Sequence, residues 1–370
     1  MIKLSICIPT FNRRDRIAEI LDKLFLMITA AGLYKSVEIL VGDNASTDDT
    51  QAYCLSLKND LVIYRYIRNL ENLGIEKNWM NLAHHSNGDY IWLLSDDDSF
   101  SSDILTEIIK LIDISVPDVI NLNYTFFDGL HEGKFYDVAC DYPADVSGIG
   151  SKHFFTITKF SSKFFSSNIF KRDKVEWALP SLKKYYGTPW LHLYLADRVI
   201  GESGKFNFVS NPLLRMRALS LLESRREKSI SGYSHFYFNA HVEFLKFLEN
   251  IDWWDKEISK KMSIEFVFQA TIEKVTWHAN TGQEDYRYWV TMVNSLLKMP
   301  HIRSSLHFWF RDIFIMLMPS LFSSAYIFTK TKRTNFGIYI RACAAKEDLL
   351  SIALFRVFKF YKNHINKTRF

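Results

Sequence analysis

The chain has 370 residues, of which 48% are hydrophobic and 24% charged, and its formal net charge is +5. This composition excludes collagen-like, low-complexity and intrinsically disordered proteins, and the length excludes a single small binding module. We therefore expect one large catalytic domain followed by a smaller region. The cysteines (Cys7, Cys54, Cys140 and Cys343) lack metal-ligand spacing, which favours reduced thiols and a cytoplasmic location.

Strand and helix patterns alternate through the first third of the chain. Short apolar runs predict strands at Lys3–Pro9, Val37–Val41, Leu61–Ile67 and Tyr90–Leu94. Apolar residues at helical spacing predict helices over Arg13–Ala30, Ile75–His85 and Asp103–Ile114. Such alternation is typical of a parallel sheet with helices on both faces, in which ligands bind beyond the carboxyl ends of the strands. The residues that follow each strand are therefore the first candidates for a functional site.

Polar residues follow three of these strands, and the last group contains three consecutive carboxylates, Asp96, Asp97 and Asp98. Three adjacent negative charges repel one another unless a cation or strong hydrogen-bond donors offset the repulsion. Mg²⁺ or Mn²⁺ would suit the cluster, because these ions bind carboxylate oxygens and keep positions for substrate phosphates. The alternative is ordinary turn chemistry, in which the acidic loop is solvent-exposed and Ser46 or Thr47 caps a helix.

Four ordered motifs resemble those of the family 2 nucleotide-sugar glycosyltransferases, which have the GT-A fold. These motifs are Ile6–Arg13, Val41–Asp48, Asn69–Gly74 and Gly88–Asp98. The aspartate-rich loop and Trp190–Leu193 most resemble bacterial O-antigen transferases, such as the abequosyltransferase-like branch. The resemblance implies a Rossmann-like α/β fold with a mixed, mostly parallel sheet flanked by helices, followed by a C-terminal helical region.

The resemblance also implies which residues bind the nucleotide. Thr10 and Asn12 would lie beside the nucleobase and the ribose, and Asp43 would hydrogen-bond the base. Asp97 would reach the ribose. Asp96 would support the nucleotide or the metal, and the sequence does not separate the roles of the consecutive aspartates.

Family 2 enzymes invert the anomeric configuration, so the resemblance implies a metal ligand and a general base. Asp98 would bind Mg²⁺ or Mn²⁺, which holds the departing nucleoside diphosphate. The family usually places an aspartate base six residues before an arginine, and here His192 stands six residues before Arg198. Histidine has a suitable unperturbed pKa for proton abstraction. A lone histidine among Trp and Leu is more often a hydrogen-bonded structural residue, and the position before Arg198 is what favours the catalytic role. Asp197 is the alternative base.

The sequence indicates three regions. These are a nucleotide-sugar transferase domain over 1–230, a helical extension over 231–300, and a basic amphipathic region over 301–370. Residues 329–370 hold ten Lys and Arg against two carboxylates. Leu306–Phe328 and Asp348–Tyr361 predict amphipathic helices. This region predicts binding to an anionic membrane surface, and hence a peripheral location on the inner face of the cell membrane. The alternative is that these helices pack on the body of the protein or form an oligomer interface.

A membrane-bound location suits the lipid-linked saccharide acceptor that the resemblance to O-antigen enzymes implies, with a nucleotide sugar as donor. Two alternatives remain. The basic tail could bind nucleic acid, but no recognised nucleic-acid motif accompanies it, so we expect no such partner. The chain could also be a non-catalytic scaffold with this fold, which the intact run of aspartates argues against.

Overall fold

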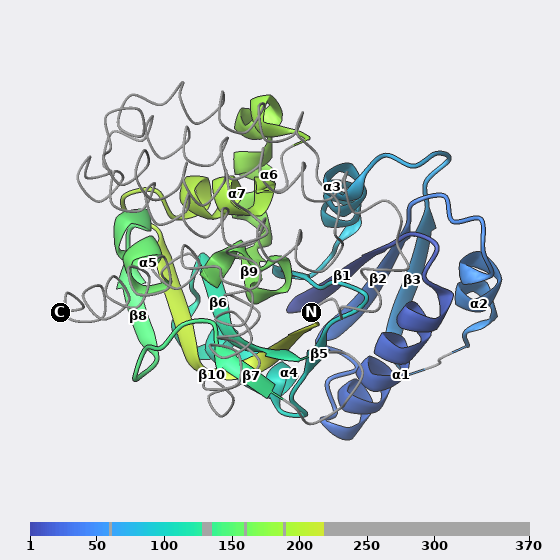
Figure 1. Ribbon diagram of the computed structural model, residues 1–370, viewed down its shortest axis with the longest axis horizontal. Coiled ribbons are helices and arrows are strands. Elements are labelled where there is room, and N and C mark those ends of the chain that lie inside the picture. Colours follow the sequence, from blue (N-terminus) through green and yellow to red (C-terminus); the bar gives the residue numbers. More distant parts are fainter. Residues whose placement is uncertain (59–60, 128–134, 159–160, 188–189, 218–370) are drawn as a thin grey trace, which may run out of the picture. The chain divides into compact units, whose positions relative to one another are not determined.

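The computed structural model describes residues 1–58, 61–127, 135–158, 161–187 and 190–217 (Figure 1). The chain divides into two units, Met1–Glu223 and Ser224–Phe370, and the described residues all belong to the first. The predicted helical extension over 231–300 and the predicted basic region over 301–370 lie outside the described residues.

The described residues form an α/β unit. Its strands are β1 (Leu4–Thr10), β2 (Val37–Asp43), β3 (Ile63–Arg68), β4 (Tyr90–Leu93), β5 (Ser99–Phe100), β6 (Val119–Phe127), β7 (Phe135–Val138), β8 (Val146–Ile149), β9 (Asn168–Lys171) and β10 (Lys205–Arg217). Its helices are α1 (Arg14–Ala30), α2 (Thr50–Ser56), α3 (Ile75–His85), α4 (Ile104–Ser115), α5 (Ser151–Thr158), α6 (Arg172–Ala178) and α7 (Leu191–Ile200), with short 3-10 helices η1 (Ser161–Lys163), η2 (Phe165–Ser167) and η3 (Leu179–Tyr185). The strands and helices predicted up to Ile114 are all present, with ends shifted by at most two residues.

The strands form one mixed sheet with the order β3-β2-β1-β4-β9-β6-β10-β5, in which β7 pairs with β6 and β8 with β10. Within this order, β3 is parallel to β2, β2 to β1, and β1 to β4. Strand β9 lies between β4 and β6 and runs antiparallel to both. Figure 1 shows β1, β2 and β3 toward one end of the sheet and β6, β8 and β10 toward the other. The expected mixed, mostly parallel sheet is confirmed for the described unit.

Continuous burial of the central strands explains why the sheet forms. All residues of β1 and of β2 are buried, which is typical of parallel strands covered on both faces. Helix α1 buries one face, made of Ile17, Ile20, Leu21, Leu24 and Ile28, which repeats at the helical spacing of three and four residues. No helix within the described residues combines the length and apolarity needed to cross a membrane.

Helix α3 packs unusually close to β2. A Cβ atom placed on Gly42 would lie 2.7 Å from Asn78 Oδ1 and 2.8 Å from Leu82 Cγ. Asn78 Nδ2 also donates a hydrogen bond to the Gly42 carbonyl at 2.7 Å. Glycine at this position therefore lets the helix approach the strand just before the loop that follows β2.

Candidate nucleotide and metal site

The carboxyl ends of the first four strands meet at one edge of the sheet. The strand register places Thr10 opposite Asp43, and Asp43 opposite Arg68. Strand β4 pairs with β1 in parallel, with Cys7 opposite Leu93, so the aspartate-rich loop leaves the sheet at the same edge. The predicted site residues on these loops are therefore brought together, as expected from parallel strands.

The loops after β1 and β2 are joined by hydrogen bonds that hold two residues in the left-handed backbone region. Asn12 has φ 53° and Ala45 has φ 64°, and this conformation is uncommon outside glycine. The Asn12 N–H donates to Ser46 Oγ at 2.9 Å, and the Thr47 N–H donates to Asn12 Oδ1 at 2.7 Å. Ser46 and Thr47 thus join the two loops instead of capping α2, and these bonds help hold the strained backbone in place.

Asp43 is a wholly buried carboxylate with three donors around it. Its Oδ1 accepts the Ser46 N–H at 2.8 Å, while Oδ2 accepts Tyr66 Oη at 2.5 Å and Arg68 Nη1 at 2.6 Å. Burial alone would raise the pKa of Asp43, but these hydrogen bonds lower it below its ordinary value, so the group is ionised. Neither Tyr66 nor Arg68 was predicted from the sequence as a site residue. Arg68 lies at the carboxyl end of β3, the same kind of position that identified the other site residues.

The guanidinium of Arg13 and the hydroxyl of Thr10 offset the first two charges of the aspartate run. Thr10 Oγ1 donates to Asp96 Oδ2 at 2.7 Å, and Arg13 Nη1 donates to Asp96 Oδ1 at 2.7 Å and to Asp97 Oδ2 at 3.2 Å. Ser95 Oγ donates to Asp97 Oδ1 at 2.6 Å. Burial raises the pKa of Asp96, and the charge of Arg13 opposes that rise. Strong donors therefore balance this part of the cluster.

Asp98, the expected metal ligand, has a different environment. It is 8% exposed, and its Oδ2 accepts a hydrogen bond from Ser166 Oγ at 2.5 Å. Ser166 was not singled out from the sequence, because nothing local connects two residues 68 positions apart.

The aspartate loop suits a divalent ion that is shared with a substrate. Among the described residues, no group of three His, Cys, Asp or Glu side chains could hold a metal. Mg²⁺ at nucleotide sites, however, usually binds one or two carboxylates and completes its shell with phosphates and water. Asp97, whose side chain is 29% exposed, and the adjacent Asp98 offer that donor set. The residues present therefore fit Mg²⁺ or Mn²⁺ together with a diphosphate.

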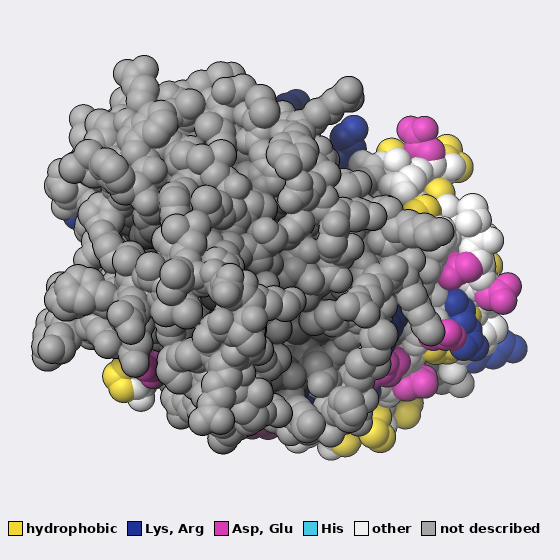
Figure 2. Space-filling model, in the orientation of Figure 1, with side chains coloured by type: hydrophobic (Ala, Val, Ile, Leu, Met, Phe, Trp, Pro, Cys, Tyr) yellow, Lys and Arg dark blue, Asp and Glu magenta, His cyan; other side chains and the backbone are white. Residues whose placement is uncertain are grey.

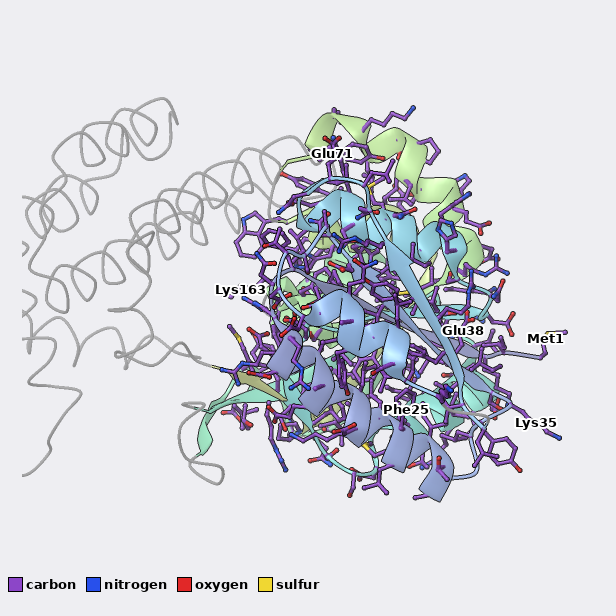
Figure 3. The ribbon with its side chains drawn as sticks, turned by 90° about the vertical axis from the view of Figure 1, so that its right-hand side faces the viewer. Met1, Phe25, Lys35, Glu38, Glu71 and Lys163 are labelled. Carbon is purple, nitrogen blue, oxygen red and sulfur yellow. The ribbon has the colours of Figure 1, made fainter. Side chains whose placement is uncertain are left out.

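Helix α7 holds His192 against the segment that contains η1 and η2. His192 is buried, and its Nε2 lies 2.8 Å from the carbonyl oxygen of Lys163, a residue labelled in Figure 3. Because a carbonyl oxygen only accepts, Nε2 carries the proton. Burial lowers the pKa of His192 to about 4, so the ring is neutral near neutral pH. Its ring centroid is 5.8 Å from that of Phe165, the neighbour of Ser166.

Asp197, the alternative base, has a raised pKa. Burial raises the pKa of its carboxyl to about 6, and within the described residues its Oδ1 has no hydrogen-bond partner. His192 and Asp197 are five residues apart on α7, so they project about 140° apart around the helix axis. A substrate bound against one face of this helix therefore contacts at most one of them.

Comparisons with known proteins bear on the fold and on the class of reaction. Residues 5–137 match the model of the glycosyl transferase family 2. The abequosyltransferase RfbV of Salmonella typhimurium is 26% identical over 292 residues, which are 71% of this chain and 79% of that protein. The GalNAc(5)-diNAcBac-PP-undecaprenol beta-1,3-glucosyltransferase of Campylobacter jejuni is 28% identical over 198 residues, covering 52% of this chain and 60% of that enzyme.

Solved structures show the same fold. The crystal structure of S. aureus TarS 1–349 superimposes with a TM-score of 0.59 at 12% identity, covering 82% of each chain. At such low identity the likeness concerns the fold alone, which is the GT-A fold. The family match and the named relatives identify the activity at the level of the reaction class. The chain is a glycosyltransferase with a GT-A fold, and its residues 5–137 match the family 2 model.

Proposed function

We propose that this protein is an inverting, metal-dependent enzyme that transfers a sugar from a nucleoside-diphosphate donor to a lipid-linked saccharide, in the synthesis of an O-antigen-type surface polysaccharide. The observation that carries the proposal is the meeting of Thr10, Asp43 and the aspartate loop at one sheet edge. The relatives, an abequosyltransferase and an undecaprenol-diphosphate-linked glucosyltransferase, support the donor and acceptor classes.

In this proposal the nucleotide binds along the edge formed by β1, β2 and β4. Thr10 and Asn12 contact the nucleobase and ribose, Asp43 bonds the base, and Asp97 bonds the ribose. Asp96 supports this contact surface through its hydrogen bonds from Thr10 and Arg13. The left-handed backbone at Asn12 fixes the position of the loop before any ligand arrives, which lowers the ordering cost of binding.

Asp98 would hold Mg²⁺ or Mn²⁺. When bound, such an ion offsets the negative charge that develops on the departing diphosphate. The chain itself must orient the acceptor hydroxyl on the opposite face of the donor sugar and accept its proton. We assign that role to α7. His192 is the first candidate, because it stands six residues before Arg198 and its ring contacts Phe165, which precedes the Ser166 that bonds Asp98.

The two candidate bases, His192 and Asp197, differ in pKa. With Nε2 bound to the Lys163 carbonyl, His192 would accept the proton on Nδ1, but its lowered pKa makes it a weak base. Asp197, with a pKa near 6, is better matched to a neutral working pH. Kinetics of the two single variants therefore decide the assignment.

We also propose that the enzyme binds the inner face of the cell membrane through residues 329–370, since its acceptor would be lipid-linked. The described residues visible in Figure 2 carry both acidic and basic side chains. The proposed contact rests on the ten Lys and Arg of residues 329–370. Sedimentation with vesicles tests this. The full chain should pellet with anionic vesicles at low salt, release at high salt, and stay in the supernatant with neutral vesicles. No binding to anionic vesicles at low salt would refute it.

The catalytic proposal is tested by thermal unfolding with a panel of nucleotide sugars, each with and without Mn²⁺. A bound donor should raise the unfolding midpoint only when the metal is present. Asp98→Asn should abolish that shift and the transferase activity while the protein stays folded. Full activity of the variant, or of the unaltered protein in excess EDTA, contradicts metal dependence.

A further inference from the structure

We propose that Ser166 is a positioning residue that orients the Asp98 carboxylate and thereby sets the affinity for the metal–diphosphate complex. The inference rests on the proposed function, because it takes Asp98 as the metal ligand. It concerns a residue outside the matched family region, which ends at residue 137.

Ser166 contacts the residues before, within and after the turn that follows β4. Its carbonyl oxygen accepts the indole N–H of Trp92 at 2.8 Å. Its hydroxyl accepts the Ser95 N–H at 2.9 Å and donates to Asp98 Oδ2 at 2.5 Å. One residue therefore anchors the last part of the strand, the start of the turn and the expected metal ligand.

The direction of each hydrogen bond follows from the chemistry of the groups. An amide N–H only donates and an ionised carboxylate only accepts. The Ser166 hydroxyl must therefore use a lone pair for Ser95 and its single proton for Asp98. Because Ser166 is wholly buried, water cannot readily replace the hydroxyl. Without it, a backbone N–H and a carboxylate oxygen would each lose this partner, which is costly for buried groups.

The segment before β9 fixes the position of Ser166. Ser166 lies in the 3-10 helix η2, directly before β9, and β9 is antiparallel to β4, with Trp92 opposite Ile169. Asn168 Nδ2 donates to the carbonyls of Ser162 and Phe164, which holds this segment in place.

Fixing one carboxylate oxygen of Asp98 limits rotation of the group, which determines where the other oxygen points. Hydrogen bonds that orient metal ligands in this way typically change metal affinity or activity by about 10–100-fold when they are removed. Ser166 should therefore affect metal binding more than it affects the rest of the nucleotide site.

The variant Ser166→Ala tests the inference, and Ser167→Ala is a matched control. Ser167 is equally buried, but its hydroxyl donates to the Phe164 carbonyl at 2.7 Å and accepts from Asn121. The Mn²⁺ affinity of each full-length protein is measured from the electron paramagnetic resonance signal of free Mn²⁺, with UDP, GDP, CDP or dTDP present.

We expect Ser166→Ala to weaken Mn²⁺ binding by about 10–100-fold and Ser167→Ala to change it by less than about twofold. If Ser166→Ala does not fold, Ser166→Cys replaces it, with an expected loss of about threefold or more because a thiol is a weak donor. Unchanged Mn²⁺ affinity of the Ser166 variant, or an equal loss in Ser167→Ala, overturns the positioning role and leaves the proposed function intact. Failure of the unaltered protein to bind Mn²⁺ with any of the four nucleotides overturns the proposed metal dependence itself.

Discussion

Replacing Arg13 with methionine removes the cation that faces the buried Asp96 carboxylate and keeps much of the side-chain length. In the structure Arg13 Nη1 lies 2.7 Å from Asp96 Oδ1 and 3.2 Å from Asp97 Oδ2. A hydrogen bond to a charged group contributes about 1.5–3 kcal/mol to stability. The Arg13 side chain is 48% exposed, so solvent screens part of its charge. We therefore expect Arg13→Met to lower the free energy of unfolding by about 1–2 kcal/mol near neutral pH.

The loss of unfolding free energy in Arg13→Met should be larger at high pH than at low pH. Burial raises the pKa of Asp96 and Arg13 opposes the rise, so removing Arg13 raises this pKa further. The destabilisation is complete at pH values above the Asp96 pKa of both proteins, where the carboxylate is ionised. It shrinks as the pH falls through those values, because a protonated carboxyl group does not need the guanidinium.

Urea unfolding of both proteins in neutral and in mildly acidic buffer measures the difference. Arg14→Met is the control, because the neighbouring Arg14 is about equally exposed but pairs with the exposed Asp15. The control should lose less stability, with little change between the two buffers. A loss in Arg13→Met that is the same in both buffers, or no larger than that of the control, would refute the assigned role of Arg13.

Further predictions concern α7 and the packing of α3. His192→Ala should reduce kcat by about 10²–10⁴-fold with little change in donor affinity. If His192→Ala lowers kcat only slightly and Asp197→Asn lowers it strongly, Asp197 is the base. Burial raises the Asp197 pKa from 3.8 to about 6. The protonated carboxyl group therefore favours the folded state at low pH, and this stabilisation is lost as the pH rises through 6. Asp197→Asn should thus gain about 1–3 kcal/mol over the unaltered protein in mildly alkaline buffer, and less in acid, as measured by denaturant unfolding. Gly42→Ala should cost about 1–3 kcal/mol, because its Cβ would overlap Asn78 and Leu82, and an unchanged unfolding midpoint would contradict that packing.

The parts of the fold and site that sequence reasoning predicted are those encoded locally. The apolar spacing of α1 identifies its buried face without knowledge of its partners, and the continuous apolar run of β1 identifies a covered strand. Since parallel strands end at the same edge, the same reasoning brings Thr10, Asp43 and Asp96 together.

The contacts that sequence reasoning missed depend on distant pairing. Strand β9 is four residues long and gives no periodic pattern long enough to predict a strand, and no local signal indicates that it lies between β4 and β6. The contact between Ser166 and Asp98 follows from that pairing. The contact of Arg13 with two carboxylates could not be inferred without the loop conformation. The roles of His192 and Asp197 stay predictions.

The position of β9 has a consequence for synthesis of the protein on the ribosome. The matched family region ends at residue 137, so it contains β4 and β6 but not the strand that separates them in the sheet. Until residues 168–171 emerge, the edges of β4 and β6 lack their native partner, and unpaired strand edges promote association between chains. An expression fragment cut at the family boundary should therefore aggregate, and a nascent chain of that length is a natural client for a ribosome-associated chaperone.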